Sequence, residues 1–299
     1  MKRITLKSTV LLLSASLIWG FAFVAQSMGM DYLGPVTFNG ARFLLGSFAL
    51  APLAILSTHY EKKHNTRRGT PKDLYIAALL CGITVCIATT LQQIGIIYTS
   101  VGKAGFITTL YIIIVPIMGV FLKRKVDGII WIGAVIAAVG LYLLCINEGF
   151  DLNRGDVYIF ICAIVFSIQI LLIAHFAPRV NCIQLSCLQF LIAGLICIAV
   201  GLPLEKPAIS AFIDGIWPLL YTGVLSCGVA FTLQITGQRD ADPSVASLIF
   251  SLESVFAVIG GYLILNQNLT PREIIGCAFM FAAVILVQFP IKFKNEVKA

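Results

Sequence analysis

Two ionisable side chains lie deep within hydrophobic runs of this chain, and they are the residues best suited to do chemistry. Arg42 interrupts the apolar run 35–57, and Glu253 interrupts the run 244–264. A charge at the centre of a lipid bilayer costs roughly 2.5–3.5 kcal/mol on insertion scales, so each residue needs a physical reason. A guanidinium can bind a carboxylate through two parallel hydrogen bonds. A carboxyl group removed from water can exchange a proton when its surroundings change.

Both residues also have plain structural explanations. Glu253 could be a static acid that bonds helix ends or pairs with Arg42, and Arg42 could instead fix helix packing or extend toward the membrane surface. The position of Glu253 near the middle of its run favours a role in proton coupling or in binding a substrate amine. The sequence leaves the role of Arg42 open between substrate binding and packing.

The elements that position these residues are hydrophobic segments. Hydrophobic residues make up 59% of the chain, charged residues only 12%, and mean hydropathy is +0.96; soluble domains carry roughly 25% charged residues. Runs of about 20 apolar residues cross a bilayer as helices, because lipid offers backbone groups no hydrogen-bond partners. The sequence predicts an all-α polytopic membrane protein with ten transmembrane helices, at 8–27, 35–57, 74–97, 102–122, 128–146, 155–175, 183–203, 215–236, 244–264 and 271–290.

The basic residues set the expected orientation. If the N-terminus lies inside, most of the 21 Lys and Arg residues fall in inner loops, and the outer ones are Lys103, Arg154, Lys206 and Arg272. Positively charged loops favour the cytoplasmic side. We therefore expect a multi-pass protein of the cell membrane, in bacteria the inner membrane, with both termini cytoplasmic. The net charge of +7 orients the protein and attracts anionic lipid rather than nucleic acid.

A short phrase occurs once in each half of the chain. Thr90-Leu91-Gln92-Gln93-Ile94-Gly95 returns as Thr232-Leu233-Gln234-Ile235-Thr236-Gly237, each time in the third segment of its half. At the start of the halves Trp19-Gly20 corresponds to Phe166-Ser167. These matches predict two five-helix repeats, 8–146 and 155–290, and an odd number of spans inverts the second copy.

Other polar and aromatic residues within the segments are candidates for contact with a substrate. Gln92 and Gln234 are expected on opposite sides of the midplane, where they could line a cavity or gates, or simply bond neighbouring helices. Lys103 could bind substrate, but its position at the start of its span favours contact with the membrane interface. Aromatic and polar side chains of the first, fourth and sixth segments could face the same cavity or pack between helices: Trp19, Tyr111, Thr108 and Gln169.

The sequence lacks the residues that several other classes of function require. The sequence has three histidines and no metalloprotease, nucleophile-elbow or phosphate-loop motif, so we expect no enzyme activity, no cofactor and no metal site. The nine cysteines form no CxxC pair. A channel is less expected than a carrier, because there is one acid at the midplane and no repeated filter.

The chain resembles the drug/metabolite transporter superfamily, EamA type. The resemblance covers nearly the whole chain and is carried by the opening Leu17-Ile18-Trp19-Gly20, by Arg42 in the second span, and by Ser251-Leu252-Glu253 with Val255-Phe256-Ala257 in the ninth. Two departures are Ser254, where the family often has Pro, and Arg124 with Gln267, where it has Glu. The resemblance implies secondary transport of small metabolites, often export of amino acids, through a central cavity, with the fifth and tenth spans at the periphery.

The sequence therefore predicts a secondary transporter of a small organic metabolite, exporting amino acids or related compounds by alternating access, with proton coupling through Glu253. Exchange of a nucleotide sugar or another organic anion is the alternative, although that function calls for more basic residues than Arg42 and Lys103. An intramembrane enzyme is the least expected class. Substrate identity, transport direction and oligomeric state are not encoded in any recognisable motif.

Overall fold

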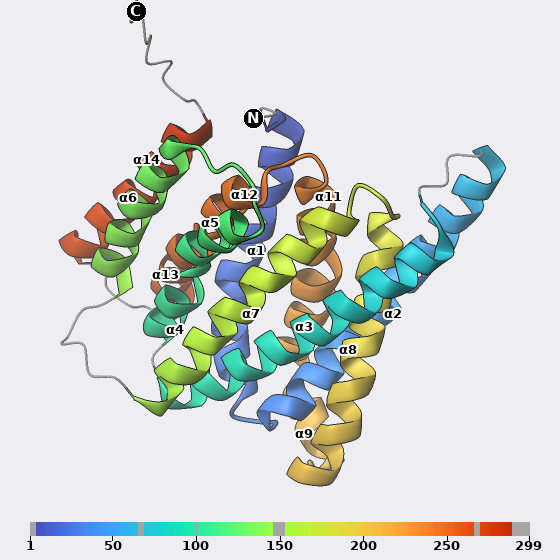
Figure 1. Cartoon of the computed structure of the whole chain (residues 1–299). Coiled ribbons are helices and arrows are strands. Elements are labelled where there is room, and N and C mark those ends of the chain that lie inside the picture. The colour runs from blue at the N-terminus through green and yellow to red at the C-terminus, as the bar shows by residue number, and fades with distance from the viewer. Residues whose placement is uncertain (1–3, 65–68, 100, 146–152, 266–269, 289–299) are drawn as a thin grey trace, which may run out of the picture.

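Helices make up all the regular structure in the part of the chain that the structure describes (Figure 1). The computed structural model describes residues 4–64, 69–99, 101–145, 153–265 and 270–288. In chain order the helices are α1 (Leu6–Gly29), α2 (Pro35–His64), α3 (Pro71–Tyr98), α4 (Val101–Thr108), α5 (Tyr111–Phe121), α6 (Gly128–Cys145), α7 (Arg154–Phe176), α8 (Cys182–Glu205), α9 (Ile209–Asp214), α10 (Ile216–Leu220), the π-helix η1 (Tyr221–Ala230), α11 (Phe231–Gln238), α12 (Pro243–Phe250), α13 (Glu253–Leu265) and α14 (Pro271–Gln288).

The predicted membrane spans correspond to these helices. Within the described residues, nine segments are long and apolar enough to cross a bilayer, and the shorter apolar helix α6 is the tenth. This confirms the all-α polytopic fold. The largest difference is at the end of α2, which continues to His64 rather than ending at residue 57. Lys62, Lys63 and His64 lie in its last turn, where positive charge complements the negative end of the helix. The predicted repeat ends at 146 and 290 lie outside the described residues.

The two five-helix halves contact each other through matching elements. The second spans, α2 and α8, form the largest contact between helices. The third span of the first half, α3, packs on α7, and the third span of the second half, η1 with α11, packs on α1. Exchanging the halves leaves this contact pattern unchanged, as expected for two repeats related by a pseudo-twofold axis. The fifth spans, α6 and α14, pack together at one edge of the bundle (Figure 1).

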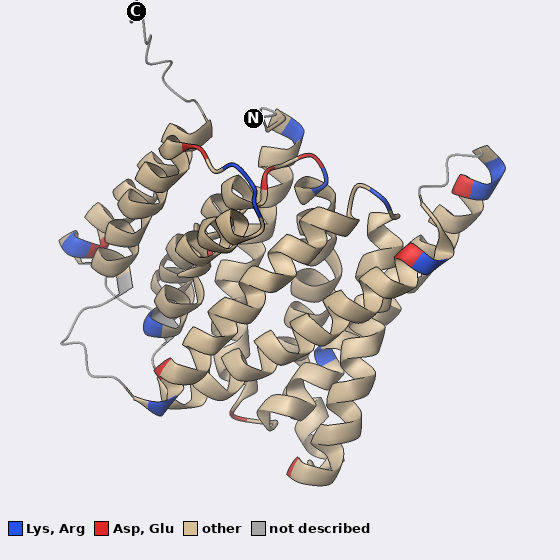
Figure 2. Cartoon of the chain, viewed as in Figure 1, with Lys and Arg blue, Asp and Glu red and all other residues tan. Residues whose placement is uncertain are grey.

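The two membrane faces differ in charge (Figure 2). We call the face at the start of α1 the N-terminal face, which also carries the loops after α5, α7 and α11. The loop after α5 contains Lys123, Arg124 and Lys125. The opposite face carries the loops after α1 and α8, and far less positive charge. This asymmetry agrees with the positive-inside pattern in the sequence.

The fourth span of each half is interrupted near its middle. α4 ends at Thr108 and α5 begins at Tyr111, while α12 ends at Phe250 and α13 begins at Glu253. At each break the backbone N–H groups bond three residues back instead of four, for example Leu110 to the carbonyl of Ile107. Such a tightened turn inside a helix often marks a functional hinge. Discontinuous helices near the midplane are also typical of substrate sites in transporters.

The glycines of the doubled phrase join the two repeats. Gly95 of α3 packs against Ile159 of α7, and Gly237 of α11 packs against Leu12 of α1. A Cβ atom at either glycine would overlap the partner side chain, so a larger residue would require that side chain to shift. The alignment that pairs Trp19 with Phe166 also pairs Leu12 with Ile159. Each copy of the phrase therefore contacts the equivalent point on the first span of the other repeat.

Candidate functional site

A cavity lies between the two repeats and is lined by residues from both. The space open to the centre of a water-sized sphere measures about 50 Å³, which is room for a few water molecules. Its lining combines one cation, one acid, several amides and hydroxyls, and a group of aromatic rings: Trp19, Phe23, Gln26, Arg42, Thr89, Gln92, Thr108, Tyr111, Phe166, Gln169, Ile170, Ser226, Cys227, Phe231, Gln234, Phe250 and Glu253.

Glu253 is the acid of this lining and the first residue of α13. Only 6% of its surface is exposed. The hydroxyl of Tyr111 donates a hydrogen bond of 2.8 Å to Oε1 of Glu253. The hydroxyl of Ser254 donates to Oγ1 of Thr109 at 3.4 Å. Both bonds join the two interrupted fourth spans, so Glu253 lies where the tightened turns of the two repeats meet.

Arg42 is the cation of the lining and comes from the middle of α2. It is buried, and its guanidinium lies 5.7 Å from the ring centre of Phe38 and 5.3 Å from that of Phe43. Among the described residues, no carboxylate lies within 4 Å of Arg42, and its Nε atom has no hydrogen-bond partner. A buried cation of this kind normally has an anion beside it. The ion pair with Glu253 considered from the sequence does not form.

A local distortion of the neighbouring helix brings the backbone of α2 close to the cavity wall. The π-helix η1 packs on α2 where Gly223 meets the backbone of Arg42 and Gly46 meets Cys227. Ser226 and Cys227 of η1 line the cavity beside the guanidinium. Its counterpart in the first half, α3, is α-helical throughout. Short π-helical segments inside α-helices are frequent at functional sites. Because α3 has no such segment, the symmetry between the repeats is broken at the cavity wall.

The uncharged polar side chains of the lining are incompletely paired. Nε2 of Gln92 donates to Oγ1 of Thr108 at 3.2 Å. Within the described residues, buried donors or acceptors of four lining side chains have no partner: Nε1 of Trp19, Oε1 of Gln26, both amide atoms of Gln169 and Oε1 of Gln234. Buried polar atoms are nearly always hydrogen-bonded in folded proteins. Unpaired atoms around a cavity therefore indicate a polar ligand or water.

Aromatic rings form the apolar part of the wall. Trp19 packs edge-on against Phe231, with ring centres 4.8 Å apart, and against Phe250 at 5.4 Å. Phe23 and Phe166 also line the cavity. A concave site with many apolar side chains and a few fixed polar groups is the usual form of a small-molecule site.

Eight of the nine candidate residues from the sequence line this cavity: Arg42, Glu253, Gln92, Gln234, Trp19, Tyr111, Thr108 and Gln169. Lys103 does not, because its Nζ lies 2.6 Å from Oδ2 of Asp156 at the start of α7. The sequence reasoning missed Phe23 and Gln26 of α1. These follow Trp19 at spacings of four and seven residues, which place all three on one helix face. Ser226 and Cys227 had no comparable signal.

The described residues show no cluster suited to a metal. They contain no group of three His, Cys, Asp or Glu side chains that could hold an ion. The eight described cysteines are free, although Sγ of Cys86 lies 3.3 Å from Sγ of Cys197.

The fold and the cavity define a class, that of polytopic helical membrane transporters built from two five-helix repeats. The chain matches the EamA-like transporter family over residues 6–146 and 153–289, and it belongs to that family within the drug/metabolite transporter superfamily. It is thus a multi-pass membrane transporter, and its family implies a small-molecule substrate.

Several curated proteins resemble it over nearly their whole length. An uncharacterized transporter of Archaeoglobus fulgidus is 30% identical, with 92% of this chain and 84% of the relative covered. The uncharacterized transporter YoaV of Bacillus subtilis is 22% identical over 93% and 95%. Protein PagO of Salmonella typhimurium is 27% identical over 87% and 88%. A solved crystal structure matches 93% of this chain and 97% of its own with a TM-score of 0.73; at 15% identity, that likeness concerns the fold alone.

Proposed function

We propose that this protein is a secondary transporter that exports amino acids or closely related metabolites by alternating access. The observation that carries the proposal is the buried guanidinium of Arg42, which lines the cavity without a carboxylate partner among the described residues. A substrate carboxylate would neutralise the charge of this guanidinium and bind it through two parallel hydrogen bonds. Unpaired amide atoms of Gln169 and Gln234 would bond the remaining polar groups of the substrate.

Glu253 is the proposed coupling group. Its carboxyl lies in the same cavity as Arg42 and is held by Tyr111 at the meeting point of the two interrupted spans. An acid in this position is charged or neutral according to whether water or a cation reaches it. Protonation of Glu253 from one side and release to the other would couple proton movement to substrate export, and the substrate amine would compete for the same carboxylate.

Alternating access follows from the architecture. Two repeats enclose one central cavity, and rocking of one repeat against the other opens it to each side in turn. The cavity lies between the repeats and is lined by both, so movement of the helices around it would change its access to each side. We place the protein in a cell membrane, a bacterial inner membrane, with both termini cytoplasmic, on the strength of its loop charges.

A nucleotide sugar fits this cavity less well. Its two phosphates would need several cations, whereas Arg42 is the single Lys or Arg residue in the cavity lining within the described part of the chain. Lys103, the second candidate cation, is engaged with Asp156. The observations therefore favour a ligand with one carboxylate and one amine.

Transport by purified protein in liposomes tests the proposal. We expect labelled amino acid inside the vesicles to exchange with external amino acid, and an imposed proton gradient to drive its accumulation. The Glu253→Gln variant keeps the shape of the side chain but cannot titrate, so exchange should persist while gradient-driven accumulation and pH dependence are lost.

Glu273→Gln is the matched control. Glu273 also lies in a membrane helix, but its carboxylate caps the start of α14 by accepting from the backbone N–H of Thr270 at 2.7 Å, away from the cavity. Its pH dependence should match that of the wild type. If a screen of amino acids gave no saturable exchange while a nucleotide sugar did, the substrate class would be wrong. Conductance that never saturates would replace the carrier by a channel.

A further inference from the structure

Two glutamine side chains, one in each repeat, form the same type of bond at opposite ends of the cavity. Nε2 of Gln93 in α3 donates to the backbone carbonyl of Gln26 in α1, at 3.0 Å. Nε2 of Gln238 in α11 donates to the backbone carbonyl of Ile170 in α7, at 3.2 Å. In both cases the third span of a repeat is tied to the first span of the same repeat. Both amides are buried.

These bonds lie just beyond the cavity lining. Gln26 and Ile170, whose carbonyls accept the bonds, line the cavity, as do Gln92 and Gln234 on the donor helices. Gln93 and Gln238 do not appear in that lining and lie further toward the ends of their helices. The Gln93 bond therefore lies at the end of the cavity toward the opposite face, and the Gln238 bond lies at the end toward the N-terminal face.

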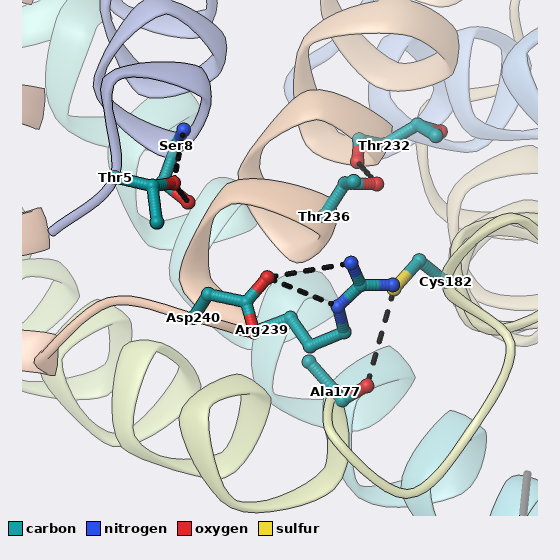
Figure 3. Close-up of polar contacts among 8 residues, drawn as sticks. All are labelled: Thr5, Ser8, Ala177, Cys182, Thr232, Thr236, Arg239 and Asp240. Carbon is teal, nitrogen blue, oxygen red and sulfur yellow. Dashed lines mark hydrogen bonds and ion pairs between the residues drawn. The ribbon is translucent and has the colours of Figure 1, made fainter. Parts of the chain in front are cut away.

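Open space begins directly outside each bond. A hollow of about 500 Å³ lies beyond Gln93 and is lined by Ser27, Ile96 and the loop after α1. Beyond Gln238 the helix ends, and Arg239 and Asp240 form an exposed ion pair of 3.3 Å (Figure 3). On α3, one turn of helix lies between Gln92 in the cavity lining and Ile96 in the hollow; on α11, about one turn lies between Gln234 in the lining and the exposed Arg239–Asp240 pair.

The helices joined by these bonds make few other contacts with each other. α1 packs mainly on α13, α11 and η1, and its contact with α3 is small. α7 packs mainly on α3, and its contact with α11 is small. Gln26 also belongs to the last turn of α1, whose carbonyls have no partner within the helix. Parting either helix pair thus costs about one hydrogen bond and little apolar packing.

We propose that Gln93 and Gln238 are the two gate residues of the transporter, each closing one end of the cavity by a single amide-to-carbonyl bond. Breaking the Gln93 bond opens the cavity to the opposite face, and breaking the Gln238 bond opens it to the N-terminal face. Both bonds are present together in the described conformation. In the described residues Oε1 of each gate amide has no partner, so it can accept a hydrogen from water or substrate as the gate opens. This role rests on the proposed alternating access and adds to it a movement of the third span relative to the first span of the same repeat.

The native thiol of Cys227 provides a test, because it lines the cavity and only 1% of its surface is exposed. A membrane-impermeant, anionic methanethiosulfonate is applied to one face at a time, in right-side-out and inside-out vesicles, and modification of Cys227 is quantified by peptide mass. Removing one gate bond should favour the state open on that side by about fivefold. Gln93→Leu should therefore be modified about fivefold faster from the opposite face, and Gln238→Leu about fivefold faster from the N-terminal face.

Three controls make the outcome decisive. Cys227→Ser removes the signal and identifies the site. Gln189→Leu removes another buried amide, which lies in α8 outside the cavity lining and without a partner among the described residues, and should not change modification from either face. Gln93→Met and Gln238→Met keep the side-chain length, so they replace the leucine variants if these fold poorly.

Equal modification of the two gate variants and the wild type from both faces would overturn the gate assignment. An effect on the wrong face, or an equal effect from Gln189→Leu, would also overturn it. The proposed transport function fails separately, if the wild-type protein shows no saturable exchange of any amino acid in liposomes. A transporting wild type with side-independent labelling in all variants leaves transport intact and removes the gates.

Discussion

At the scale of single residues, the cavity separates two charges that would otherwise neutralise each other. Arg42 belongs to α2 and Glu253 to α13, and the acid is bonded to Tyr111 rather than to the guanidinium. A direct ion pair would satisfy both groups and leave little drive to bind substrate. Held apart, the two groups would match the two ends of the proposed amino-acid substrate. Binding of that substrate would then place an opposite charge beside each group.

Arg42→Lys tests this complementarity. Lysine keeps the charge but loses the planar fork that holds a carboxylate by two hydrogen bonds, so the KM for an amino acid should rise about tenfold or more. The KM for the corresponding amine, which has no carboxylate, should change little. Both values come from exchange assays in liposomes. An equal loss for acid and amine would mean that Arg42 serves helix packing.

The site residues differ in how far the sequence could predict them. Polar or charged side chains inside apolar runs, such as Arg42, Glu253 and Gln169, attract notice because burial is costly without a function. The sequence does not show, however, which side chains pair with one another. Lys103 was expected at the membrane interface or, as the lesser alternative, at the substrate; Asp156, far along the chain, pairs with it at 2.6 Å. Such pairings depend on which helices become neighbours.

At the scale of elements, hydropathy predicted the spans but not their interruptions. The breaks after Thr108 and after Phe250 contain neither Pro nor Gly, the usual signals of a kink. Side-chain hydroxyl groups donate hydrogen bonds to backbone carbonyls there. Thr109 donates to the carbonyl of Gly105 at 2.8 Å, and Ser251 donates to that of Leu248 at 2.7 Å. Ser and Thr make such bonds in many straight helices too. Their presence in the sequence alone therefore did not predict a break.

Replacing the glycines of the doubled phrase should weaken the contact between repeats. In Gly95→Ala the new methyl group overlaps Ile159, and in Gly237→Ala it overlaps Leu12. Overpacking of this kind costs about 1–3 kcal/mol, so the melting temperature in detergent should fall in both variants. Gly105→Ala is the control, because the nearest atom to its new methyl is Oγ of Ser254 at 3.8 Å. It should be neutral or slightly stabilising. Equal melting temperatures of all three variants would show that these glycine contacts do not stabilise the protein.

At the scale of the whole molecule, the twofold relation explains both the fold and its exceptions. The contacts α3 with α7 and α11 with α1 repeat it. The Gln93 and Gln238 bonds join the same pair of spans in each repeat but come from positions that the alignment does not match. The cavity breaks the twofold relation. The alignment that pairs Trp19 with Phe166 pairs Arg42 with Gln189, and the fourth spans, aligned at a separation of 143 residues, pair Glu253 with Leu110. Symmetric parts suit a motion that must run equally well in two directions. The proposed amino-acid substrate has two different ends, and its binding would require unequal residues at the centre.

The orientation of the molecule in the membrane is expected from its loops. Most positive charge lies at the N-terminal face, which should therefore be cytoplasmic. Single cysteines at two exposed positions test this: Asp31→Cys in the loop after α1 and Lys125→Cys in the loop after α5. An impermeant maleimide should label Asp31→Cys in intact cells, and Lys125→Cys only after permeabilisation. The wild-type chain measures the background, which should be low because seven of its eight described cysteines are buried. The reverse labelling pattern would mean that the N-terminal face lies outside the cell. Each glutamine gate would then open toward the other compartment.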